Sequence, residues 1–177
     1  SVFVYGNEFL RAVSAGTELA MTRSLSYKGD KAPEEAATEF YTDGAIAVAA
    51  DLQSETYYFG DVRGDEIAWY AYNMRLGTTS VRNVSVYYYN DLTANQAGVT
   101  TETAMNMSKT YKTDAFSKIA DISSDTPNLQ SVTYYQGEKG DEVSDYSSNY
   151  RVGTSTVKNT SVFVYGNEFL RAVSAGT

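Results

Sequence analysis

Residues 131–142 read SVTYYQGEKGDE, and residues 54–66 read SETYYFGDVRGDE. Each stretch begins with Ser, Thr and Tyr, which suit a pleated strand, and ends with Gly and Asp, which supply the backbone angles of a turn. The same order, a Ser-x-Ser/Thr-Tyr segment followed by a polar segment, occurs again at residues 24–27 and 108–111. This pattern predicts an all-β protein made of successive strands and tight turns.

The other strand signals extend this pattern along the chain. The two prolines, Pro33 and Pro127, lie in polar breaks, so neither disrupts a central strand. Residues 7–14 and 32–40 are the best candidates for short helices, although neither has a clear apolar stripe. Segments rich in Tyr, Val, Thr and Phe predict strands at residues 54–59, 67–74, 80–89, 105–112, 131–135, 146–152 and 156–165.

The two ends of the chain have the same sequence. Residues 1–17 read SVFVYGNEFLRAVSAGT, and residues 161–177 repeat that string without one change, at an offset of 160 residues. The simplest explanation is one 160-residue period plus a short overlap, taken from a longer array of near-identical copies. An engineered permutant with a copied end is the alternative.

A second, more divergent repeat lies inside the period. Residues 64–89 align with residues 140–165, and 13 of the 26 aligned pairs are identical. We therefore divide the chain into residues 1–23, the end of a preceding half-repeat, residues 24–107, half-repeat A, and residues 108–177, half-repeat B. Trp69, the only tryptophan, is the most conspicuous difference between the halves, because it aligns with Asp145.

Two architectures are compatible with these repeats. In the first, an elongated, repetitive β-hairpin meander or β-solenoid, each unit contacts only its neighbours. In the second, the chain forms two tandem small β-sandwich domains. The short recurring motif and the absence of a linker favour the first. The sixteen tyrosines are interpreted as cross-strand structural ladders, with a sugar-binding platform as the alternative.

The composition excludes several classes of function. The chain has no His and no Cys, so it lacks a Ser-His-Asp triad, a Cys nucleophile and the usual ligands of zinc, haem and iron–sulfur clusters. Its net charge of −8 argues against nucleic acid and anionic membranes as partners. The longest apolar run, residues 45–50, is far shorter than the roughly 20 residues of a membrane span. We expect no enzyme activity, no cofactor and no membrane insertion.

The repeated motifs also resemble a known class of sequence. Residues 131–142 with 159–166, and residues 54–66 with 83–90, are similar to the tandem-repeat arrays of very large bacterial cell-surface proteins. Those arrays repeat variants of TYY-G-KGDE and NTTVYYYG, and the resemblance covers about half of the period clearly. It implies an extracellular, fibrous and non-enzymatic role without catalytic residues.

Two turn motifs are candidate binding sites. Arg63, Gly64 and Asp65 spell the tripeptide of integrin ligands, but related basic-Gly-Asp turns elsewhere in the chain favour ordinary hairpin chemistry. Clustered carboxylates in two turns are weak candidates for a calcium site, although neither turn matches a known calcium loop. These acidic residues are Asp61, Asp65, Glu66, Glu138, Asp141 and Glu142.

The sequence therefore predicts a structural repeat segment of an extracellular fibre, stalk or filament at the cell surface. The alternative is a surface adhesin that binds a glycan or a host receptor. The expected partners are neighbouring copies of the chain, arranged head to tail, because identical ends prefer the same packing site and an unpaired strand edge recruits another chain. The predicted self-association residues are Val2, Phe3, Val4, Tyr5, Val162, Phe163, Val164 and Tyr165.

Overall fold

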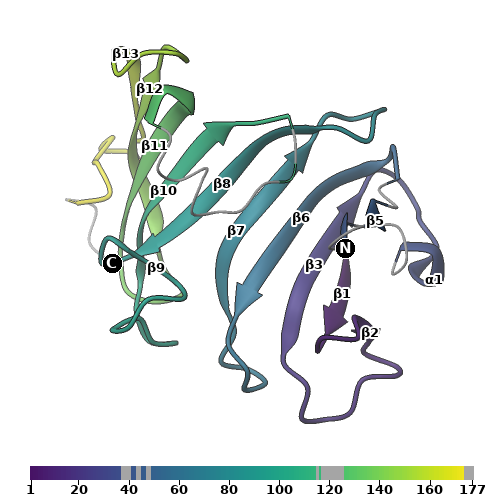
Figure 1. Cartoon of the computed structure of the whole chain (residues 1–177). Helices are drawn as coiled ribbons and strands as arrows, with labels where there is room; N and C mark the ends of the chain where they lie inside the picture. The colour runs from purple at the N-terminus through teal and green to yellow at the C-terminus, as the bar shows by residue number, and fades with distance from the viewer. Residues whose placement is uncertain (37–40, 43–44, 47–48, 115, 117–125, 174–177) are drawn as a thin grey trace. The chain divides into compact units, whose positions relative to one another are not determined.

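The computed structural model describes residues 1–36, 41–42, 45–46, 49–114, 116 and 126–173. Helix within these ranges is limited to α1 (Pro33–Ala36) and a short 3-10 turn, η1 (Thr126–Asn128). The prediction of an all-β protein is confirmed (Figure 1). Neither of these described helical segments has the length and apolar character that crossing a membrane requires.

Eleven strands form one open antiparallel sheet. They are β1 (Val2–Tyr5), β2 (Leu10–Arg11), β3 (Met21–Tyr27), β6 (Leu52–Phe59), β7 (Ile67–Met74), β8 (Val81–Tyr89), β9 (Leu92–Thr93), β10 (Met105–Lys112), β11 (Leu129–Gln136), β12 (Val143–Tyr150) and β13 (Val157–Val162). The hydrogen-bonded order is β13-β12-β11-β10-β8-β7-β6-β3-β1-β2, with β9 paired to β8. Two further strands, β4 (Tyr41–Thr42) and β5 (Ala45–Ile46), pair with each other.

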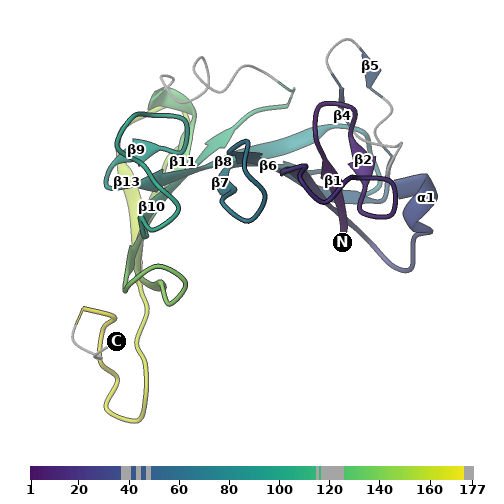
Figure 2. The same ribbon diagram turned by 90° about the horizontal axis from the view of Figure 1, so that it is seen from below.

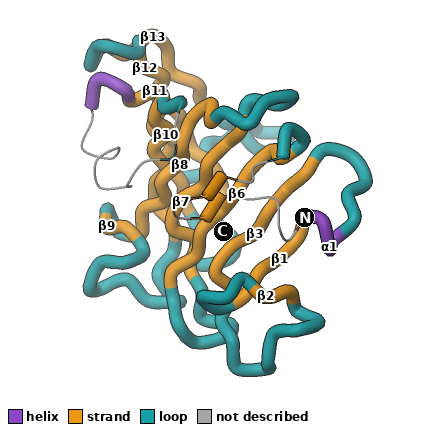
Figure 3. Tube along the Cα trace, turned by 45° about the vertical axis from the view of Figure 1, so that its right-hand side comes forward, coloured by secondary structure: helices purple, strands orange, loops and turns teal. Residues whose placement is uncertain are grey.

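This strand order is that of a meander. From β3 to β13, the main strands neighbour each other in the sheet in the order in which they follow in the sequence. The tube in Figure 3 shows these strands in orange and the described loops and turns between them in teal. The arrangement agrees with the predicted hairpin meander and differs from two tandem sandwiches, each of which would need two face-to-face sheets.

One predicted element is wrong. Residues 7–14 were expected to be helical, but they form a tight turn and strand β2, which pairs back on β1. The reason is local, because Gly6 and Phe9 adopt positive φ angles of 64° and 55°, whereas a right-handed helix needs negative φ at every residue. Of the second candidate helix, residues 32–40, only α1 is helical, and residues 37–40 lie outside the described residues.

The chain forms two compact units that divide within β8. Unit 1 comprises Ser1–Val84 with Thr113–Phe116, and unit 2 comprises Ser85–Lys112 with Ser117–Thr177. These units differ from half-repeats A and B, whose boundaries remain a prediction from the sequence. The difference arises because a repeat can be counted from any starting residue, whereas a compact unit follows the packing of the strands.

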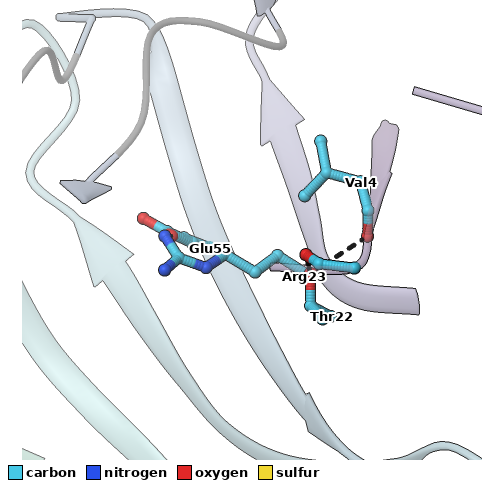
Figure 4. A network of polar contacts seen from close by, with 5 residues as sticks. Val4, Thr22, Arg23 and Glu55 are labelled. Atoms are coloured by element: carbon cyan, nitrogen blue, oxygen red, sulfur yellow. Dashed lines mark hydrogen bonds and ion pairs between the residues drawn. The ribbon is translucent and has the colours of Figure 1, made fainter. Parts of the chain in front are cut away.

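The interior of unit 1 contains an ion pair beside stacked tyrosines. Leu25 and Leu52 are fully buried, and beside them Arg23 Nη1 lies 2.7 Å from Glu55 Oε1, with the Glu55 side chain wholly inaccessible to solvent (Figure 4). The Tyr57 ring stacks on the Tyr70 ring of the adjacent strand at a centroid distance of 4.4 Å. Burial, with a further contribution from the nearby Glu55 carboxylate, raises the pKa of Tyr57 well above its ordinary value.

Unit 2 repeats the tyrosine pair without that ion pair. Tyr134 and Tyr146 stack at 4.5 Å, so the cross-strand tyrosine pairs expected from the sequence are present in both units. An amide contact between neighbouring strands is also shared: Asn73 donates to Asn83 at 2.9 Å and Asn149 to Asn159 at 2.8 Å. Met107, which lies opposite Tyr134 in the neighbouring strand, and Val132 are buried near this tyrosine pair.

Candidate self-association site

The duplicated segment forms the same hairpin at both ends of the chain. We call residues 1–17 the N-terminal copy and residues 161–177 the C-terminal copy, of which residues 161–173 are described. Tyr5 pairs with Leu10 in the first copy, and Tyr165 forms an isolated bridge with Leu170 in the second. The Tyr165–Leu170 bridge has two backbone hydrogen bonds, of 2.7 and 3.1 Å.

The turn inside this hairpin is also the same. Gly6 and Phe9 have φ angles of 64° and 55°, and Gly166 and Phe169 have φ angles of 68° and 54°. In each copy the phenylalanine N–H donates to the glycine carbonyl at 3.4 Å. Because this shape recurs in two different surroundings, the segment itself determines the hairpin.

The two copies differ in what covers them. The Val4 side chain is fully buried, whereas Val164, its identical counterpart, is 50% exposed. β1 has β3 on one side, but β13 ends the sheet order and pairs with β12 alone among the described strands. Figure 2 shows the C-terminal copy in yellow where the chain continues from β13. A strand edge that is covered in one copy is therefore open in the other.

The N-terminal copy fits β3 through backbone and side-chain contacts. Thr22 Oγ1 donates to the carbonyl of Val4 at 3.4 Å (Figure 4). It also donates to the carbonyl of Gly6 at 3.2 Å, and Gly6 N–H donates to Ala20 O at 3.0 Å. The Arg23 guanidinium lies over the Phe9 ring, 4.4 Å from its centroid. The antiparallel register is Val2–Leu25, Phe3–Ser24, Val4–Arg23 and Tyr5–Met21.

The arginine of each copy binds a different carboxylate. Arg11 contacts Glu34 at 2.6 Å in an exposed ion pair. Arg171 instead forms a bidentate ion pair with Asp145, whose side chain is 3% exposed. The hydrogen bond to Asp145 raises the pKa of Arg171 further above its ordinary value. This pair anchors the C-terminal copy to unit 2, and the sequence marked Asp145 as unusual without revealing its partner.

Glu66 and Glu142, two of the calcium candidates, bind backbone N–H groups. Glu66 accepts from Met21 N–H at 2.6 Å and from Gly64 N–H at 2.9 Å. Glu142 repeats this arrangement with Met105 at 3.0 Å and Gly140 at 2.9 Å. Partial burial of Glu142 raises its pKa, but these N–H donors outweigh that effect and hold the pKa below its ordinary value. Both carboxylates therefore connect a turn to the start of another strand.

The other acidic candidates do not gather into a site. Asp61, Asp65, Glu138 and Asp141 are exposed in their turns. Across the described ranges, no three carboxylates come close enough together to hold a metal ion.

The Arg-Gly-Asp turn packs against the N-terminal copy. Arg63 donates to Thr17 O at 3.1 Å and lies 6.0 Å from the centroid of the Tyr5 ring. In the aligned turn of unit 2, the Lys139 ammonium lies 5.9 Å from the Tyr89 ring. The basic residue of each turn thus contacts a tyrosine at the end of a hairpin strand, which is a structural use of the motif.

Comparisons of this chain with protein-family models, with curated proteins and with solved structures find no match. The functional argument therefore depends on the chain's own geometry, above all on the duplicated segment.

Proposed function

We propose that this chain is a structural repeat segment of an extracellular fibre, stalk or filament, and that it assembles end to end with copies of itself. One observation carries the proposal: the same strand sequence is paired with β3 at one end, where its Val4 is buried, and lies at the open sheet edge at the other. Val4 is 0% exposed and Val164 is 50% exposed. A protein with one surface that fits a different surface of its own copies forms open chains or rings rather than two-fold dimers.

The character of the open edge supports this proposal. All six residues of β13 are exposed. Apolar side chains are exposed at Val157 and Val162 in the strand, and at Phe163 and Val164 directly after it. Exposed edge strands with apolar residues favour pairing with another chain, and proteins that remain monomeric usually protect such edges. The extracellular location is supported by the resemblance of the turn motifs to bacterial surface repeats.

The tyrosine pairs give less support to an adhesin. Tyr57 and Tyr70 stack on each other, as do Tyr134 and Tyr146. Arg23 lies over Tyr57, and Arg171 lies over Tyr146. Rings engaged in this way offer fewer free faces to a sugar than a splayed platform would.

Sedimentation velocity at increasing protein concentration tests the proposal. The full chain is expected to form a series of growing species, because a head-to-tail contact leaves a free end for the next copy unless its rotation closes a ring. A variant that ends at Val162 keeps β13 but lacks Phe163, Val164 and the hairpin of the C-terminal copy, and it is expected to associate much more weakly. A full chain that stays monomeric from micromolar to near-millimolar concentration would rule out end-to-end assembly.

A further inference from the structure

We propose that two chains join by strand replacement. In this contact, residues 161–165 of one chain take the place on β3 that residues 1–5 hold in the second chain, in the same register. The inference rests on the proposed end-to-end assembly and specifies its contact. It also identifies the partner surface as the edge of β3 in another copy of this chain.

Strand replacement is supported first by the identical sequences of residues 1–5 and residues 161–165. β3 binds a strand of sequence SVFVY in the structure, and residues 161–165 have that sequence. Every backbone bond and side-chain contact that β3 makes with the N-terminal copy is therefore available to the C-terminal copy of another chain. The two differ only in that the resident strand is tethered to β3, which raises its effective concentration. Replacement should consequently be slow and should increase with protein concentration.

The second argument is that the required edge is open. In the order β3-β1-β2, β1 uses one edge for β3 and the other for its own hairpin partner. The C-terminal copy already carries that hairpin partner, since Tyr165 pairs with Leu170. The edge corresponding to the β3 side of β1 is the outer edge of the sheet at β13.

The third argument is the exposure of side chains that β3 would cover. Phe169 is 73% exposed, whereas Phe9, its counterpart, packs under the Arg23 guanidinium at 4.4 Å. Val164 is half exposed, whereas Val4 is fully buried. Strand replacement would give both exposed side chains the contacts that their counterparts have.

The fourth argument is a precedent within the chain. β8 aligns with the strand that contains the duplicated residues, and it lies between β7 and β10 in the sheet order. Its Ser85 Oγ lies 3.2 Å from Thr110 Oγ1, and Ser1 Oγ likewise donates to Ser26 Oγ at 3.5 Å. With β10 beside it, Val86 is fully buried, whereas the aligned Val162 is 53% exposed. The proposed contact between chains repeats this arrangement.

Replacement leaves no buried charge without its partner. Arg171 keeps its pair with Asp145 in its own unit. The displaced Arg11 gives up only Glu34, whose side chain is 75% exposed. An exposed pair of this kind contributes little to stability, so its loss does not oppose the exchange.

The same substitution at two identical positions tests the proposal in the full chain. Val164→Glu should abolish association, with a loss of about a hundredfold or more in the association constant, because the register places the glutamate opposite Arg23, which is already paired with Glu55, so two buried carboxylates would share one cation. Val4→Glu should increase association, because it weakens the resident strand and frees β3. Val4→Ala is a milder variant with the same expected direction if Val4→Glu fails to fold. If Val164→Glu associates like the parent chain, or if Val4→Ala and Val4→Glu associate less, strand replacement is wrong.

Cysteine cross-linking tests the register, since the chain has no cysteine of its own. Phe3 pairs with Ser24 in the structure, so the Phe3→Cys, Ser24→Cys double variant should form a disulfide within one chain and thereby calibrate the geometry. A mixture of two single variants, Ser24→Cys and Phe163→Cys, should then form a mixed disulfide dimer. A mixture of Ser24→Cys with Val164→Cys is the control that is shifted by one residue.

The cross-linking outcomes separate this inference from the proposed function. If the calibration disulfide forms, the chain associates in sedimentation and the 24–163 mixture gives no more dimer than the shifted control, strand replacement is wrong while end-to-end assembly stands. If the chain does not associate at all, the proposed function fails first. A 24–163 dimer that disappears when a synthetic peptide of residues 1–17 is added in excess confirms the replacement, because the peptide competes for β3.

Discussion

The two halves of this chain build the same local structure around different interiors. In unit 1, Arg23 and Glu55 form a buried ion pair beside the stacked Tyr57 and Tyr70. At the aligned places in unit 2 the residues are Met107 and Val132, and both are buried beside the corresponding tyrosine pair. At these two aligned positions, one half thus encloses two charges and the other encloses two apolar side chains, while the buried charge of unit 2, Asp145, lies at a different position.

This difference shows which features specify the fold. The strand register, the tyrosine stack and the asparagine contact are common to both halves, whereas the ion pair is not. A buried ion pair costs desolvation energy that its attraction only partly repays, and an apolar pair of similar volume is often as stable. We infer that turns and tyrosines determine the hairpins. The Arg23–Glu55 pair is one of two sets of buried side chains that are compatible with this fold.

The largest expected effect comes from removing one partner of the Arg23–Glu55 ion pair. Glu55→Val leaves the Arg23 guanidinium buried without its carboxylate, and we expect a loss of about 3–5 kcal/mol in the free energy of unfolding. The double variant Arg23→Met, Glu55→Val copies the residues of unit 2 and should recover most of that loss. Urea unfolding followed by tyrosine fluorescence measures both variants. If the double variant were as unstable as the single one, the charged pair and the apolar pair would not be equivalent at these positions.

A second comparison concerns the glycine that begins each acidic turn. Gly60 and Gly137 have φ angles of 132° and 121°, so alanine is strained at both. A Cβ on Gly137 would lie 2.5 Å from Asp141 O, whereas a Cβ on Gly60 would lie 3.2 Å from Asp65 O. We expect Gly137→Ala to cost about 2–3 kcal/mol and Gly60→Ala about 1–2 kcal/mol. Thermal unfolding of the two variants checks the order, and a larger cost at Gly60 would contradict it.

The smallest expected effect is a pH dependence at Glu142. Its native pKa is lowered relative to its ordinary value of 4.5. The contribution of Glu142 to the free energy of unfolding is therefore complete above pH 4.5, and it is lost as the pH falls through the lower native pKa. Glu142→Gln should cost about 1 kcal/mol at neutral pH, and its difference from the parent chain should become smaller at an acidic pH below 4.5.

A charge-matched control isolates this effect. Glu138→Gln removes the same charge from an exposed position in the same turn, and it should change the stability little at either pH. Equal effects of the two substitutions would mean that net charge, and not the bonds to Met105 and Gly140, is responsible. Urea unfolding at both pH values makes the measurement.

Much of the fold could be predicted from local sequence. β7 and β10 begin and end at the predicted residues, because runs of Tyr, Thr, Val and Met lie between clear turn signals. The hairpin at residues 5–10 was missed because its turn depends on a positive φ at Phe9, which a bulky side chain rarely adopts. No local pattern indicates such an angle.

The candidate site was predictable only in part. The duplicated strand was recognised from sequence identity alone, whereas the contacts that distinguish its two copies join distant residues. Arg11 reaches Glu34 across 23 positions, and Arg171 reaches Asp145 across 26. Such contacts depend on the register of intervening strands, and residue types do not reveal them in advance.

The hairpin within the duplicated segment has a consequence for folding kinetics. Its closing contact, Tyr165 with Leu170, spans five positions in the sequence, and hairpins of this kind form in about 1–10 μs. The segment can therefore acquire its shape before it meets any other strand. β3 then captures a preformed element rather than an extended coil, which lowers the entropy lost on docking. The slow step of strand addition would accordingly be the departure of the resident copy and not the ordering of the incoming one.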